Sequence, residues 1–124
     1  MKVRWTYEHN ESTKHQGEYK GELKDRKLDG LGRWVGASER IEAEWKEGKI
    51  HGRAVLYQRN CREEFEMQSG RYHGLSIIYW EGGRRLEREF LNGRLHGRER
   101  EWNKNGTIYQ EDLYEQGSWV KRIK

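Results

Sequence analysis

The tetrapeptide Lys49-Ile50-His51-Gly52 decides the fold, because three near-copies of it recur along the chain. They are Lys27-Leu28-Asp29-Gly30, Arg71-Tyr72-His73-Gly74 and Arg94-Leu95-His96-Gly97, and the closing glycines of the four copies lie 22, 22 and 23 residues apart. A fixed period of about 20 to 50 residues is typical of a repeat array, in which one small unit stacks on copies of itself. The sequence therefore predicts an extended surface rather than a fold built around a pocket.

The residues before each tetrapeptide alternate between apolar and charged side chains, as a half-buried strand does. The stretch Ile41-Glu42-Ala43-Glu44-Trp45 is one example. A turn is expected at Glu47-Gly48, Asn92-Gly93 and Gln116-Gly117, because glycine can take the positive φ of a tight hairpin turn. We therefore expect an all-β protein: an elongated, single-layer antiparallel β-meander of tandem hairpins, with roughly nine or ten strands spanning about 45 Å.

The pattern predicts one domain over residues 1–124. Its expected parts are a cap strand over 1–7, a polar loop over 8–16, hairpin repeats over about 17–40, 41–60, 61–83 and 84–106, and a partial repeat with a cap strand over 107–124. Arg26 stands where the other units have the turn glycine, which predicts a strained or looser turn. The third unit has about two extra residues between Phe65 and Gly70, which predicts a bulge or a longer turn.

One register satisfies both the apolar pattern and the charges. If Trp45 lies opposite Ile50, then Ala43 lies opposite Gly52 and Glu42 opposite Arg53. The same arithmetic pairs Phe90 with Leu95, Glu87 with Arg98 and Leu23 with Leu28, and it places Tyr19 over Gly32. A slip by one residue would separate these pairs, so we adopt this register as the prediction.

The composition predicts a thin core and two largely hydrated faces. Only 32% of the residues are hydrophobic, 37% are charged and the mean hydropathy is −1.31, but six Trp and seven Tyr supply apolar area. The net charge of +4 comes from 25 basic and 21 acidic residues that are interleaved, with no Lys/Arg run longer than two. We therefore expect no specific nucleic-acid partner. The start of the chain lacks the apolar stretch of a signal peptide, and no stretch is long enough to span a membrane, so a cytoplasmic location is expected.

The residues that could support catalysis or metal binding are better explained by the repeat. His51, His73 and His96 occupy equivalent positions, so neighbours should lie roughly 9–10 Å apart, too far to share one zinc ion. Cys61 is expected to be a small buried residue equivalent to Ile41, and Gly82-Gly83 a linking turn. The glutamates of the strands are expected to form a charge ladder with neighbouring arginines. The sequence thus predicts no enzyme activity, no metal site and no cofactor.

A family resemblance accompanies these features. Tyr19-Lys-Gly-Glu-Leu-Lys-Asp-Arg-Lys-Leu-Asp-Gly-Leu-Gly resembles the MORN repeat, and the later units resemble the bacterial MORN-variant family. In those units Ala54, Ser76 and Glu99 replace the second glycine of the motif, and Ala43, Glu63 and Arg88 replace the first. The resemblance covers residues 17–119. It implies a repeat scaffold that binds other molecules, and the antitoxin or immunity label of many bacterial members implies a protein partner.

The predicted register places Trp34 and Trp45 on one face of the sheet and a set of aromatic and arginine residues on the other. Clusters of this kind are common at the centres of protein interfaces. The candidate partner-binding residues are Tyr57, Tyr79, Trp102, Arg53, Arg98 and Arg100. The predicted function is a non-catalytic protein-binding module, an antitoxin, immunity protein or other inhibitor that blocks a toxin or defence protein by surface contact. The alternatives are a phage- or virus-encoded inhibitor of a host defence protein, which would act by the same physics, and a scaffold on anionic membrane surfaces.

Overall fold

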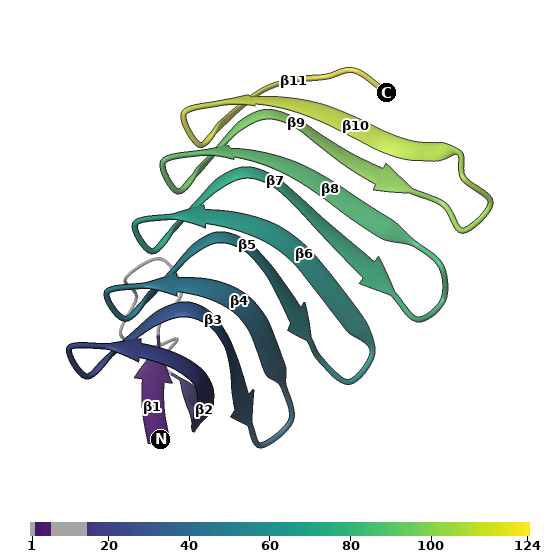
Figure 1. Cartoon of the computed structure of the whole chain (residues 1–124). Helices are drawn as coiled ribbons and strands as arrows, with labels where there is room; N and C mark the ends of the chain where they lie inside the picture. The colour runs from purple at the N-terminus through teal and green to yellow at the C-terminus, as the bar shows by residue number, and fades with distance from the viewer. Residues whose placement is uncertain (1, 6–14) are drawn as a thin grey trace.

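The computed structural model describes residues 2–5 and 15–124, which form one open sheet of eleven antiparallel strands in chain order (Figure 1). The strands are β1 (Lys2–Trp5), β2 (His15–Lys24), β3 (Lys27–Gly36), β4 (Arg40–Lys46), β5 (Lys49–Tyr57), β6 (Cys61–Gln68), β7 (Arg71–Trp80), β8 (Arg85–Leu91), β9 (Arg94–Trp102), β10 (Ile108–Glu115) and β11 (Ser118–Arg122). The predicted all-β meander of hairpins is confirmed, with slightly more strands than expected. In this part of the chain there is no helix with the length and apolarity needed to cross a bilayer.

The predicted first cap strand lies partly within the described residues. Strand β1 pairs with β2, while Met1 and residues 6–7 lie outside the described part. Residues 8–14 of the predicted polar loop also lie outside it, and His15 and Gln16 belong to β2. At the other end β11 pairs with β10, as the second cap strand was expected to do.

Five two-residue turns close the hairpins and line up along one edge of the sheet (left in Figure 1). In each turn both residues have positive φ, which matches the right-handed twist of the strands that they join. The turns are Asp25-Arg26, Glu47-Gly48, Ser69-Gly70, Asn92-Gly93 and Gln116-Gly117. Arg26 adopts φ 63° where its counterparts have glycine, so the predicted backbone strain is present, but the turn is not longer than the others.

The predicted register holds next to each turn and shifts further along the strands. Trp45 lies opposite Ile50, but Ala43 lies opposite Ala54 rather than Gly52, and Glu42 opposite Val55 rather than Arg53. Two extra residues of β5 bulge out at Gly52, whose φ is 90°. Two extra residues in one strand leave the alternation of its side chains between the two faces unchanged. The face of each residue was therefore predicted correctly, although its cross-strand partner was not.

The same shift occurs in the neighbouring hairpins. Phe90 lies opposite Leu95 as predicted, whereas Glu87 lies opposite Arg100 instead of Arg98. Leu23 lies opposite Leu28, and Tyr19 is paired with Trp34. The Tyr19 ring nevertheless covers Gly32, since a Cβ at Gly32 would collide with it.

The third hairpin corrects the predicted alignment of that unit. Met67, not Phe65, is equivalent to Trp45, because Met67 lies opposite Tyr72 just as Trp45 lies opposite Ile50. The turn is therefore no longer than its neighbours. Phe65, not Glu63, occupies the position of the first motif glycine, and Cys61 lies two residues outside the position of Ile41. The two extra residues had been inferred only because Phe65 was aligned with Trp45, since both are aromatic.

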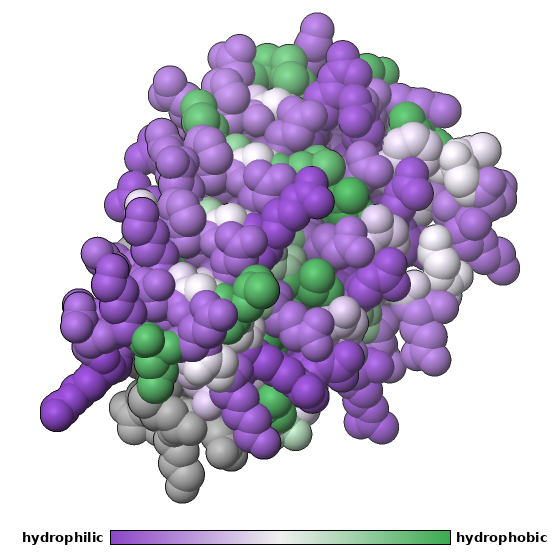
Figure 2. All heavy atoms as spheres, viewed as in Figure 1, coloured by the Kyte–Doolittle hydropathy of each residue, from purple (hydrophilic) through white to green (hydrophobic). Residues whose placement is uncertain are grey.

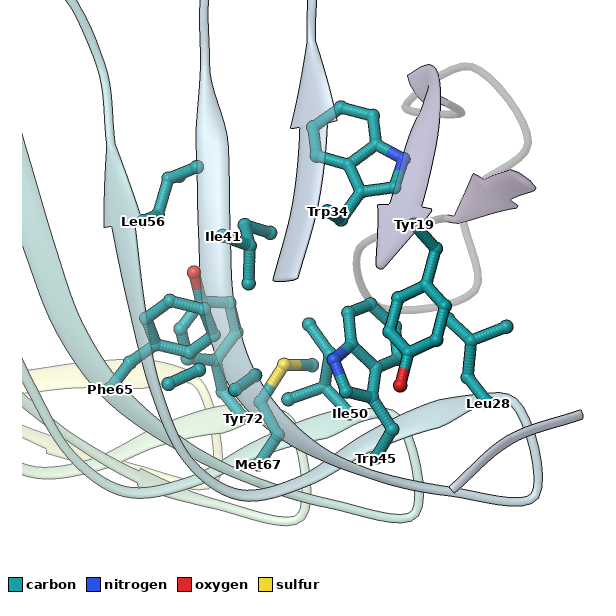
Figure 3. Close-up of a cluster of buried hydrophobic side chains, with 12 residues drawn as sticks. Tyr19, Leu28, Trp34, Ile41, Trp45, Ile50, Leu56, Phe65, Met67 and Tyr72 are labelled. Atoms are coloured by element: carbon teal, nitrogen blue, oxygen red, sulfur yellow. The ribbon is translucent and has the colours of Figure 1, made fainter. Parts of the chain in front are cut away.

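One face of the curved sheet, the inner face, carries the hydrophobic core (Figure 3). The buried core residues come from β2 to β7, and they are Tyr19, Leu28, Trp34, Ile41, Ala43, Trp45, Ile50, Ala54, Leu56, Phe65, Met67 and Tyr72. The large residues before each turn lie opposite the bulge glycine of the preceding hairpin, as Trp45 does with Gly30 and Met67 with Gly52. Aromatic packing on bare backbone was expected, and here it joins one hairpin to the next.

From the third hairpin onward, one row of residues on the inner face becomes polar. A row of facing residues that begins with Ala43, Ala54 and Phe65 continues as Ser76, Arg88, Glu99 and Asp112. Buried Glu63 accepts hydrogen bonds from the Tyr72 hydroxyl (3.1 Å) and the Ser76 hydroxyl (2.6 Å), and it pairs with Arg88 (3.5 Å). A buried charge is tolerated when it is paired and hydrogen-bonded in this way.

Candidate protein-binding surface

The opposite, outer face carries a row of alternating arginine and aromatic side chains that crosses the sheet from β4 to β9. Facing pairs run in sequence through Arg40, Tyr57, Arg62, Tyr79, Arg85 and Trp102. We call these six residues the Arg–aromatic ladder. Each arginine is the first or second residue of the first strand of a hairpin, and each aromatic residue lies at or next to the end of the second strand, so one pair recurs per repeat.

Each arginine of the ladder lies over the ring of its own hairpin. The distance from Cζ to the ring centroid is 4.0 Å for Arg40 and Tyr57, 4.2 Å for Arg62 and Tyr79, and 4.5 Å for Arg85 and Trp102. These are cation–π distances, and such contacts contribute about 0.5–1 kcal/mol at exposed sites. The stacked arginines have little freedom to lose when a partner binds.

A glutamate two residues further along each strand forms an ion pair with the same arginine. The Nε to Oε1 distances are 3.9 Å from Arg40 to Glu42, 3.6 Å from Arg62 to Glu64 and 3.3 Å from Arg85 to Glu87. The arginine side chains stay between 38% and 47% exposed. The ladder is therefore a set of oriented, accessible cations, each fixed by a ring and a carboxylate.

The sequence prediction placed three of the six ladder residues. Tyr57, Tyr79 and Trp102 do lie together on the outer face. The three predicted arginines lie on this face as well but contact carboxylates: Arg53 contacts Glu66 (3.9 Å), Arg98 contacts Glu111 (3.3 Å), and Arg100 contacts Glu111 and Glu87. The arginines that stack on the rings are Arg40, Arg62 and Arg85, which sequence reasoning missed. Their own spacing of 22 and 23 residues was the signal that could have found them.

The ladder ends beside a hollow of about 790 Å³ at the edge of the sheet opposite the hairpin turns. Its lining comes from the ends of β7 and β9, the starts of β8 and β10 and the connections between them, and it includes Trp80, Arg84, Arg85, Glu101, Lys104 and Tyr109. Arg84 pairs with Glu101 (3.3 Å) and lies 5.7 Å from the Tyr109 ring centroid. Trp80 and Tyr109 are 42% and 58% exposed, so the hollow offers large apolar surface beside cations.

The carboxylates at the C-terminal end of the sheet are held in the charged form. A hydrogen bond from Arg100 lowers the pKa of Glu111. Hydrogen bonds from the Trp119 indole (3.1 Å) and Arg122 (3.0 Å) lower the pKa of Asp112. Glu99 differs, because burial raises its pKa even though Arg88 opposes the rise. The last two hairpins are therefore joined by charged groups, where the first three have a hydrophobic core.

Two of the repeat histidines, His73 and His96, and the cysteine have structural contacts. The Nδ1 atom of His73 accepts a hydrogen bond from the backbone N–H of Asn92 (3.4 Å), and that of His96 from Gln116 (3.2 Å), so each supports the turn of the next hairpin. Cys61 is only partly buried and its thiol contacts Gln58 (3.4 Å), which corrects the expectation that it is a buried residue equivalent to Ile41. The position equivalent to Ile41 belongs to Glu63 instead. Among the described residues, no group of three or more His, Cys, Asp or Glu is placed to hold a metal ion.

Comparison with known proteins gives no further assignment: no family model matches the chain, and a search of curated proteins finds no match.

Proposed function

We propose that this chain is a non-catalytic protein-binding repeat module of the MORN-like type, which holds a partner protein against the Arg–aromatic ladder of its outer face. The observation that carries the proposal is the ladder itself: three stacked Arg–aromatic pairs repeat across six adjacent strands. Arginine, tyrosine and tryptophan are the residues most enriched at the energetic centres of protein interfaces.

The surroundings of the ladder support a protein partner. The face shown in Figure 2 is mostly hydrophilic with small, separate apolar patches, as is typical of transient interfaces rather than permanent ones. The hollow beside Trp80 would accept an apolar or acidic side chain of the partner, since it combines exposed rings with Arg84 and Lys104. Binding to a broad, preorganised face would block a partner by covering its surface.

We infer further that the partner is a toxin or a defence protein, so that the chain acts as an antitoxin, an immunity protein or a comparable inhibitor. This finer proposal rests on the resemblance to the bacterial MORN-variant family. An inhibitor of host defence encoded by a phage would use the same contacts.

Site-specific photo-crosslinking tests the proposal in cells of the native source. A photoreactive phenylalanine analogue at Tyr79 should crosslink one dominant protein, while the same analogue at Leu31, which is exposed and off the ladder, should not. The triple variant Tyr57→Ala/Tyr79→Ala/Trp102→Ala should lose binding of the identified protein at least a hundredfold. If Tyr79 captures no protein, or Leu31 captures the same one equally well, the ladder is not the binding surface. Inhibition of the purified partner at a 1:1 ratio would support the inhibitor role, and unchanged activity would refute it.

A further inference from the structure

The edge of the sheet formed by the hairpin turns carries a second row of cations, separate from the arginines of the outer face. The row, here called the turn edge, consists of Lys24, Lys27, Lys46, Lys49, Arg71 and Arg94. All six flank the turns of successive hairpins and are exposed. The turn glycines connect these hairpins, because the N–H of Gly48, Gly93 and Gly117 each donates to a carbonyl of the preceding hairpin. The cations are therefore held in one line although they lie far apart in the chain.

These cations differ from the arginines of the ladder in their contacts. None of the six forms an ion pair with any residue that the structure describes. Lys24 lies directly opposite Lys27, and Lys46 opposite Lys49. Like charges in facing positions destabilise a sheet. The facing lysines therefore add no stability to the first two hairpins, and their charges are available to an anion.

A hollow of about 300 Å³ between the third and fourth turns is the place on this edge where an anion could bind. It is lined by Arg71, Leu91, Asn92, Arg94, His96 and Gln116, with no carboxylate among them. The stems of Arg71 and Arg94 pack over the turn glycines Gly93 and Gly117, which leaves their guanidinium groups at the surface. Two guanidinium groups and two amides around one hollow suit a tetrahedral oxyanion, because each supplies N–H donors.

The histidine of this hollow is oriented to donate. The Nδ1 atom of His96 accepts the backbone N–H of Gln116, so the proton of the neutral ring is on Nε2. His73 is held in the same way by Asn92 one hairpin earlier. This hydrogen bond between a histidine and the following turn thus occurs in two successive hairpins, at a spacing of two strands or about 9.6 Å. The first two turns contain Asp25 and Glu47, whereas the next two contain Ser69 and Asn92, so the strongest site is around Arg71 and Arg94.

We propose that the turn edge binds the phosphate backbone of a nucleic acid, without sequence preference. A line of cations that recur at the hairpin spacing matches a polymer of phosphates. A protein partner is disfavoured here, because protein interfaces are depleted in lysine and rich in aromatic residues, and Leu91 is the one apolar residue lining the hollow. A membrane is disfavoured because surface-bound segments also insert apolar side chains. This inference does not depend on the proposed function, since it concerns a different surface.

The test is a fluorescence anisotropy titration of the full chain with a labelled 24-base-pair DNA duplex at 50 and 200 mM salt. The turn-edge variant Lys49→Gln/Arg71→Gln/Arg94→Gln should lose at least tenfold in affinity at 50 mM salt. In a plot of log affinity against log salt concentration, the magnitude of the slope should be smaller by about two to three than for the parent chain. Each lost phosphate contact removes about 0.9 from that slope. The matched control Lys20→Gln/Arg33→Gln/Arg59→Gln has the same net charge and changes exposed cations away from the turn edge. It should lose no more than about twofold.

Three outcomes would overturn the proposal. The first is no duplex binding at 50 mM salt, and the second is equal loss in the two variants. The third is equal competition by polyglutamate at the same charge concentration, which would indicate a general polyanion site rather than a phosphate site. Flotation with vesicles that contain anionic lipid is the final measurement. If the chain binds the vesicles but not the duplex, the turn edge binds membranes instead of nucleic acid. Crosslinking from Tyr79 is a separate measurement on the outer face. Failure of the nucleic-acid proposal can therefore be distinguished from failure of the proposed protein-binding function.

Discussion

At the scale of single residues, the turn positions decide how well each hairpin closes. Arg26 adopts φ 63° and Gly48, in the equivalent position, adopts φ 82°. A left-handed conformation costs a residue with a side chain roughly 1–2 kcal/mol, and glycine avoids that cost. The turn of the first hairpin therefore has two residues with side chains in this conformation, Asp25 and Arg26, whereas the turn of the second has one, Glu47.

Replacing Arg26 by glycine should therefore stabilise the protein by about 1 kcal/mol, measured as the free energy of unfolding in urea. The matched change Gly48→Ala should destabilise it by a similar amount. No atom lies within 4 Å of the Cβ position at Gly48, so this change tests the backbone conformation alone. Equal stability of Arg26→Gly and the parent chain would show that the turn carries no such strain.

The bulge glycines make a second prediction at this scale. Gly74 has φ 90°, and a Cβ there would approach the Glu66 carboxylate to 2.9 Å. Gly74→Ala should cost about 1–2 kcal/mol, because both the conformation and the space are unsuitable. Gly82→Ala serves as the control, since its Cβ position is open, and it should change stability by less than about 0.5 kcal/mol. Thermal unfolding of the two variants side by side gives the comparison.

At the scale of hairpins, a pair of buried charges joins the third unit to the fourth. The Glu63 carboxylate is 10% exposed and lies 3.5 Å from Arg88. Removal of Arg88 alone leaves Glu63 uncompensated, so Arg88→Leu should cost about 3 kcal/mol. In the double variant Glu63→Leu/Arg88→Leu the loss should be clearly smaller than the sum of the single losses. Additive losses in this double-mutant cycle would contradict a direct interaction.

The hairpins also show which features could be predicted from sequence and which could not. The alternation and the Glu47-Gly48 type of turn revealed the strands, the turns and the two faces. The bulge at Gly52 was not predictable from the alternation, because two extra residues restore the same face. Cys61 was misplaced because Phe65 resembles Trp45, although Met67 is its true counterpart.

The candidate site was predicted in part for a similar reason. Tyr57, Tyr79 and Trp102 followed from the face assignment alone, which the bulge does not change. The arginines could be identified only from the exact cross-strand partners. Because the predicted register differed from the observed one by two residues, the prediction named Arg53 and Arg98 instead of Arg40 and Arg62. The turn-edge cations were missed because a search for runs of Lys and Arg ignores residues one period apart.

At the scale of the whole molecule, stability should fall in acid. The pKa values of Glu111 and Asp112 are lowered in the folded state, so the stability that they contribute is present above their ordinary values of about 4 and is lost as the pH falls through the lowered ones. Melting temperatures measured from pH 7 to pH 2.5 should drop steeply below about pH 4. The variant Glu111→Gln/Asp112→Asn should show a flatter profile and a lower melting temperature at pH 7.

Glu99 should act in the opposite direction. Its pKa is raised by burial, so its contribution to stability is present below the ordinary glutamate value of about 4.3 and is lost as the pH rises through the raised value. Glu99→Gln should therefore raise the melting temperature at pH 7 and leave it nearly unchanged at pH 4. A lower melting temperature at pH 7 would show that the charged form is stabilised by its neighbours.

The stacking of hairpins also bears on how a partner finds its position. Contacts between elements are concentrated between consecutive strands, and each Arg–aromatic pair recurs one hairpin after the last. A partner with its own groups spaced about 9.6 Å apart could slide by a whole hairpin and bind again with one pair fewer. A partner with irregular groups would have a single position. Duplication of one hairpin would lengthen the ladder by one pair, and so would adjust the reach of the molecule without redesign of the rest.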